Sequence, residues 1–125
     1  MNVQIAKDAY SKVKKETSST SKTNHGNVGM ALKKLQSNML NMLQTEDQES
    51  FKKSYKTALY AVYFLQQSLD FDKGGELATN LFRLYEFCRI NIETAVISGQ
   101  PKLSNLTAAT KYIGEIKESW DKIAT

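Results

Sequence analysis

The sequence predicts an all-α protein, an antiparallel four-helix bundle with an additional short N-terminal helix. The chain of 125 residues contains one proline and six glycines, which are too few turn formers for a fold built from many short strands. Apolar residues recur at intervals of three and four along most of its length, and this spacing places them on one face of a helix. Four of these segments are long and are joined by short connections, as in a bundle. At this length we expect one domain with a single core.

The first element expected is a short helix over residues 1–16. Its apolar positions follow a spacing of three to four residues and are Val3, Ala6, Tyr10 and Val13. Residues 17–27 are polar, lack periodicity and are rich in turn formers, so we expect a flexible loop there. The short helix is therefore predicted to be a mobile element tethered to the bundle, which occupies residues 28–125.

Two long helices are predicted next, over residues 28–43 and from the Thr45 cap to about Gln67. The inward face of the first consists of Leu32, Leu35, Met39 and Met42. Thr45 and Gln48 have the spacing of a capping box, in which the threonine oxygen accepts an early backbone N–H and the glutamine reaches back. The inward face of the second helix consists of Phe51, Tyr55, Ala58, Val62 and Leu65, continued by Leu69. The alternation of four and three is typical of helices that pack at a shallow angle.

Glycines mark the ends of the fourth predicted helix. The Gly-Gly pair at 74–75 predicts a bend, because each glycine inside a helix costs about 1 kcal/mol relative to alanine. A helix is expected from there to about Ile97, with Leu77, Leu81, Leu84, Cys88, Ile92 (or Asn91) and Ala95 on its inward face. Ser98-Gly99 ends it, and Pro101 suits the first turn of the last helix. The inward face of that helix consists of Leu106, Ala109, Ile113, Ile116, Trp120 and Ile123.

No group of residues suited to catalysis stands out. The single histidine, His25, lies in the polar loop, and the single cysteine, Cys88, lies on an apolar helix face, where a small buried side chain is expected. Metal sites bring several His, Cys or carboxylate ligands together, and one of each far apart forms no such cluster. We therefore expect no enzyme activity, no metal and no cofactor. The lone cysteine suits a reducing cytoplasm, and no apolar run reaches the roughly 20 residues that cross a bilayer, so we expect no stable membrane insertion.

Positive charge is concentrated near the start of the chain. Residues 1–35 contain seven lysines against two acids, whereas the rest contains ten Lys and Arg against eleven Asp and Glu. A basic segment can bind nucleic acid. These lysines, however, occur among many Ser and Thr residues and few aromatic ones, which is typical of a solvated segment. We expect no nucleic-acid partner, and salt-sensitive binding of unrelated DNA would support the opposite view.

The third and fourth predicted helices carry more apolar residues than a core needs. A bundle helix directs about three positions in seven inward. The surplus residues are Leu59, Tyr60, Tyr63 and Phe64 on one helix and Phe82, Tyr85, Phe87 and Ile90 on the other. Some of them can widen the core, but together they predict a second apolar surface, which usually marks a partner site. The partner could be an amphipathic helix or the chain's own first helix.

One segment, Ser68 to Phe87, carries a family resemblance. Its matching positions follow the pattern Leu-Asp-x-x-x-Gly-Gly-Glu-(Ile/Leu)-Ala-x-Asn-Leu-x-x-Leu-Tyr and are Leu69, Asp70, Gly74, Gly75, Glu76, Leu77, Ala78, Asn80, Leu81, Leu84 and Tyr85. The chain resembles the family of the flagellar secretion chaperone FliS in this run and in the order of its elements. Residues 17–45 depart from the family pattern.

The resemblance implies a cytoplasmic chaperone that works without ATP. Such a protein would bind the C-terminal helical segment of flagellin, prevent its premature polymerisation and aid its secretion, with the flagellar export apparatus as a further partner. The first helix would cover part of the same groove until the client displaces it. The residues expected to contact the partner are Tyr10, Leu32, Met39, Tyr60, Tyr63, Phe64 and Phe82. The alternative is a helical adaptor that forms a homodimer through the surplus face and binds no unfolded client.

Overall fold

The computed structural model describes residues 25–122. It contains the helices α2 (His25–Gln44), α3 (Gln48–Ser68), α4 (Phe71–Ser98) and α5 (Leu106–Asp121), and a short 3-10 helix, η2 (Pro101–Leu103). No strand occurs within residues 25–122, so the predicted all-α class is confirmed for this part of the chain. The helix predicted at 1–16 and most of the loop predicted at 17–27 lie outside the described residues.

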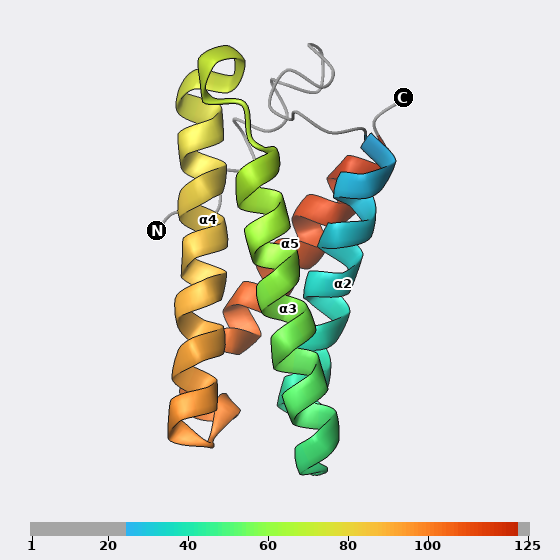
Figure 1. Cartoon of the computed structure of the whole chain (residues 1–125), viewed down its shortest axis with the longest axis vertical. Coiled ribbons are helices and arrows are strands. Elements are labelled where there is room, and N and C mark those ends of the chain that lie inside the picture. The colour runs from blue at the N-terminus through green and yellow to red at the C-terminus, as the bar shows by residue number, and fades with distance from the viewer. Residues whose placement is uncertain (1–24, 123–125) are drawn as a thin grey trace.

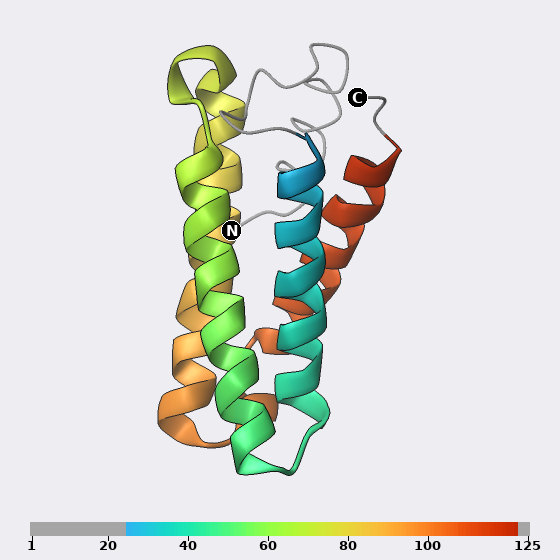
Figure 2. The same ribbon diagram turned by 45° about the vertical axis from the view of Figure 1, so that its right-hand side comes forward.

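The four α-helices run in alternating directions along the long axis of the molecule (Figure 1). α2 packs against α3 on one side and against α5 on the other, and α4 packs against the same two helices. Turning the molecule separates α2 and α5 from α3 and α4 and shows both pairs running antiparallel (Figure 2). The arrangement agrees with the predicted four-helix bundle.

The core lies where the predicted inward faces meet. Every predicted core position within residues 25–122 is buried, except Phe51 and Tyr55, which are half-buried and pack against the core. The alternatives Asn91 and Ile92 are both buried. Burying a large aliphatic side chain stabilises the fold by about 1.5–3 kcal/mol, so these stripes account for most of the drive to form the bundle.

The start of α3 differs from the predicted capping box. Asp47 is the N-cap, and its side chain accepts a hydrogen bond from the backbone N–H of Ser50 at 2.9 Å. Thr45 accepts from the N–H of Asp47 at 3.2 Å, one step before the helix. The Thr45–Gln48 box was therefore wrong: Asp47 is itself a strong N-cap residue, and it places Gln48 at the first helical position, where it cannot reach back.

α4 begins four residues earlier than predicted, and its backbone breaks at Gly75. Asp70 caps the start by accepting from the N–H of Lys73 at 3.0 Å. Gly75 has φ 53° and ψ −129°, a conformation that glycine adopts without a Cβ penalty. The prediction of a bend at the Gly-Gly pair is confirmed, with one short turn of helix in front of it.

The connection from α4 to α5 begins as predicted and then departs from the prediction. Gly99 ends α4 in the left-handed conformation at φ 68°, as expected. Pro101 does not start the last helix, since it starts η2, and α5 begins only at Leu106. The delay has a physical cause: buried Asn91 accepts a hydrogen bond from the N–H of Asn105 at 3.0 Å and donates one to the carbonyl of Phe87 at 2.8 Å. Asn91 therefore fixes where the chain enters α5.

A contact between His25 and Trp120 joins the start of α2 to the end of α5. The indole N–H of Trp120 donates to the backbone carbonyl of His25 at 2.8 Å, and the two rings stack with centroids 4.4 Å apart. Gly29 allows this approach, because a Cβ there would lie 3.2 Å from the indole. His25 was predicted to lie in a loop. That prediction was wrong, since the Trp120 contact extends the helix back to His25.

Candidate partner-binding groove

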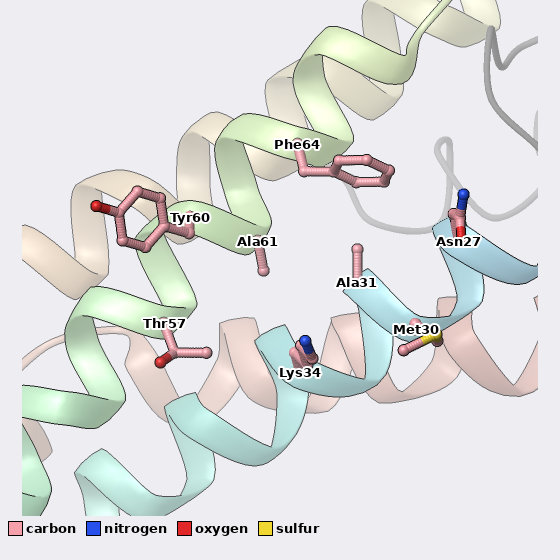
Figure 3. A pocket seen from close by; sticks show the side chains of 8 residues that line it. All are labelled: Asn27, Met30, Ala31, Lys34, Thr57, Tyr60, Ala61 and Phe64. Carbon is pink, nitrogen blue, oxygen red and sulfur yellow. The ribbon is translucent and has the colours of Figure 1, made fainter.

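A groove of about 420 Å³ lies between α2 and α3, near the start of α2 and the end of α3. Its lining residues are Asn27, Met30, Ala31 and Lys34 from α2 and Thr57, Tyr60, Ala61 and Phe64 from α3 (Figure 3). The volume falls within the range of about 300–1,000 Å³ that is usual for ligand sites. We call it the α2–α3 groove.

The groove exists because two alanines lie where the helices face one another. Ala31 and Ala61 are 7% and 6% exposed and form its floor. Larger side chains rise on both sides, and the ring of Phe64 reaches from α3 toward α2 above Ala31 (Figure 3). A small side chain between larger ones leaves a hollow that the neighbouring core cannot fill.

Apolar and aromatic side chains rim the groove and face solvent. Tyr60 is 75% exposed, Met30 57% and Phe64 37%. Tyr63, also exposed, follows on the next turn of α3 but does not line the groove. An apolar rim around a hollow is the kind of surface that a partner covers.

The structure brings together only part of the predicted contact set. Tyr60 and Phe64 line the groove. Phe82 lies on α4 and pairs instead with Phe71 at a ring-centroid distance of 6.0 Å. Tyr10 lies outside the described residues.

Leu32 and Met39 need a correction. Both are completely buried in the core, so neither offers surface to a partner of the folded bundle. For Leu32 the error has a geometric cause. Leu32 follows Ala31, which faces the groove, and the side chains of consecutive helical residues point about 100° apart. The groove is lined by residues beside the predicted stripe rather than by the stripe itself.

The predicted surplus of apolar residues is only partly exposed. Tyr85 is buried, and Phe87 is half-buried and packs against Tyr112 with centroids 6.2 Å apart. Leu59 is also half-buried against the core. These residues widen the core. The surplus residues that stay exposed are Tyr60, Tyr63 and Phe64 on α3 and Phe82 and Ile90 on α4.

Six of the residues that line the groove were not predicted from the sequence. These are Asn27, Met30, Ala31, Lys34, Thr57 and Ala61. Met30 carried a usable signal, because it is a large apolar residue off the core stripe of its helix. Ala31 and Ala61 also indicate a hollow, but this can be recognised only once the register of α2 against α3 is known.

The remaining polar chemistry of the bundle is structural. Burial raises the pKa of the Cys88 thiol well above its ordinary value, which keeps it protonated and unreactive. Hydrogen bonds from Arg89 and Gln66 lower the pKa of Glu86, and the bond from Gln66 ties α3 to α4. Within residues 25–122, no three His, Cys, Asp or Glu side chains converge as a metal site would require. No helix in that range is both long and apolar enough to span a bilayer.

An antiparallel helical bundle with an open apolar groove is the form of a partner-binding protein. Comparison with known families names the class more closely. The family model described as "Flagellar protein FliS" matches residues 6–125, and the chain belongs to this FliS family.

One curated relative supports this assignment. A protein from Pseudomonas aeruginosa, described as "Flagellar secretion chaperone FliSB", is 38% identical to the chain over 60 residues. The aligned region makes up 48% of this chain and 46% of that protein, so the chain matches about half the length of its curated relative. No solved structure gives a significant match.

Proposed function

We propose that the protein is an ATP-independent cytoplasmic export chaperone that binds the C-terminal helical segment of flagellin. By covering the apolar stripe of that segment it would prevent premature polymerisation and aid secretion. Membership of the FliS family supports the flagellar role, and the relative from Pseudomonas aeruginosa is described as a secretion chaperone. The single observation that carries the binding mode is the open α2–α3 groove with its exposed aromatic rim.

The dimensions of the groove suit a short stretch of amphipathic helix. Asn27 to Lys34 covers about 10 Å along α2 at 1.5 Å per residue. This length accepts two turns of a client helix, which present apolar side chains at positions i, i+3 or i+4, and i+7. The alanine floor leaves room for those side chains, and Phe64 and Tyr60 provide flat apolar area around them. Binding of this kind requires burial of apolar surface and no nucleotide.

The test measures binding of the purified C-terminal segment of flagellin from the same organism. Phe64→Asp should weaken binding about thirtyfold, since loss of an aromatic contact on which a partner rests costs about 2 kcal/mol or more. Ile97→Asp is the matched control: Ile97 is 86% exposed at the far end of α4 and should leave affinity unchanged. The proposal fails if the wild-type chain binds no flagellin, or if Phe64→Asp binds as tightly as the control.

The helical adaptor is the second candidate, and the exposed rim would then be a homodimer interface. Light scattering of the purified chain separates the two. A dimer that persists on dilution, dissociates on Phe64→Asp and binds no flagellin would favour the adaptor.

A further inference from the structure

Positive charge accompanies the α2–α3 groove. α2 and α3 together contain five lysines, and no acid occurs at residues 25–45 or 50–69. The acids of this region are Glu46, Asp47 and Glu49, at the turn that joins the two helices. The groove lies toward the opposite end of both helices, and Lys34 is the charged residue among the side chains that line it.

Three lysines are placed along the groove. Lys34 lines it from α2 (Figure 3). Lys53 lies one helical turn before Thr57, and Lys56 one turn before Tyr60, so both continue the α3 wall toward the turn that joins α2 to α3. All three are exposed.

No acid from residues 25–122 neutralises these three lysines in an ion pair. Arg89 pairs with Glu86 and Glu93, and Lys117 pairs with Asp121, whereas the remaining Lys and Arg residues within 25–122 form no such pair. The position of Lys34, Lys53 and Lys56 beside the groove is therefore what distinguishes them. The groove and these three lysines together form a surface with two recognition features, an apolar floor and cations along one side.

We infer that the α2–α3 groove selects an amphipathic helix whose apolar stripe is flanked by Asp or Glu residues. Lys34, Lys53 and Lys56 pair with those carboxylates, while the alanine floor and the aromatic rim take the apolar stripe. This inference deepens the proposed function and rests on it for the identity of the client as a flagellin segment. Charge complementarity of this kind gives specificity and speeds association.

Charge also disfavours two other occupants. Residues 1–24 contain five lysines and two acids, so they carry the same sign as the groove. A second copy docked groove to groove would bring identical lysines together, because a twofold interface places the same patch on both sides. An acidic partner helix is the occupant that the charges favour.

The expected effect is moderate and depends on salt. An exposed ion pair contributes up to about fivefold in affinity, so three pairs together should contribute about tenfold or more at low salt. Screening shortens the range of these contacts from about 10 Å at 0.1 M salt to about 3 Å at 1 M. The apolar contribution should persist at high salt.

The experiment uses the full chain and two synthetic amphipathic peptides of about 20 residues. Both carry the same apolar stripe, flanked by Glu in one and by Gln in the other. Fluorescence anisotropy at about 0.05 M and about 0.5 M salt measures their affinities for three proteins. The proteins are the wild type, a groove variant with Lys34→Gln, Lys53→Gln and Lys56→Gln, and a control variant with Lys73→Gln, Lys102→Gln and Lys111→Gln.

The wild type and the control variant should prefer the Glu peptide about tenfold at low salt, and the groove variant should lose that preference. Circular dichroism checks that all three proteins keep their helical content. Equal affinity of the wild type for both peptides would overturn the inference. Equal loss in both variants would also overturn it, because the effect would then come from net charge.

Flagellin binding, measured on the same three proteins, separates this inference from the proposed function. A preference for the Glu peptide without flagellin binding would refute the function and keep the charge selectivity. Flagellin binding that is equal in the wild type and the groove variant, together with equal peptide affinities, would keep the function and refute the selectivity.

Discussion

Ala61→Leu should strongly weaken client binding while leaving the bundle intact. Ala61 forms the floor of the α2–α3 groove and faces an open hollow of about 420 Å³, so a larger side chain can enter the groove without displacing the core. The added three carbons would occupy the space that the client's apolar side chain needs. At about 0.8 kcal/mol for each methylene that the client can no longer bury, the loss is about 2.4 kcal/mol, or about fiftyfold in affinity.

Two measurements on the same protein test this prediction. Titration calorimetry with the flagellin C-terminal segment should show the fall in affinity, and thermal unfolding should show a change in stability of no more than about 0.5 kcal/mol. Ala108→Leu makes the same chemical change at a half-buried position on α5 that does not line the groove, and it should alter neither quantity. Unchanged affinity with Ala61→Leu would refute the idea that the client occupies the alanine floor.

Three further predictions concern stability. Trp120→Phe removes the indole N–H that bonds to His25 and part of the ring stack, so the free energy of unfolding in urea should fall by about 2–3 kcal/mol; a loss below about 0.5 kcal/mol would contradict this contact. Asn91→Ala leaves the N–H of Asn105 without its acceptor and should cost about 1–3 kcal/mol in the same assay, whereas a neutral result would show that water replaces the side chain. Glu86 has a lowered pKa, so its ion pair stabilises the fold above the unfolded-state pKa of about 4.3 and this contribution disappears as the pH falls through the lowered value. Glu86→Gln should therefore lower the free energy of unfolding near neutral pH by no more than about 1 kcal/mol, which a lower melting temperature would report. This difference from the wild type should vanish in acid. A difference that persists in acid would refute the role given to Glu86.

The helical stripes of the core were predictable because burial imposes a strict period. A residue such as Leu81 or Ile113 repeats at three and four with its neighbours, and both are buried. Glycine was equally informative, since Gly75 and Gly99 have positive φ where a bend and a helix end were expected. These features depend on local sequence and on one face of one helix at a time.

Features that depend on contacts between distant segments were not predictable in the same way. His25 belongs to a helix because Trp120, 95 residues later, stacks on it and bonds to its carbonyl. The start of α5 is delayed because the side chain of Asn91 holds the backbone of Asn105. Propensity and periodicity contain no information on such pairs.

The contact set was only partly predictable because apolar character does not by itself separate core from surface. Leu32 and Tyr60 were both apolar candidates, and one is fully buried whereas the other is 75% exposed. The groove itself depends on small residues, Ala31 and Ala61, which attract little notice in a sequence. Their role follows only from the register in which α2 and α3 face each other.

The position of the groove next to the His25–Trp120 contact connects stability with binding. Asn27 and Met30, which line the groove, lie within five residues of His25, in the first turns of α2. Helix ends fray unless they are held, and a frayed start of α2 would remove one wall of the groove. Because Trp120 fixes this end against α5, the wall is in place without a client, and less ordering entropy would oppose the proposed binding. The tryptophan would therefore support the proposed client binding although it does not line the groove.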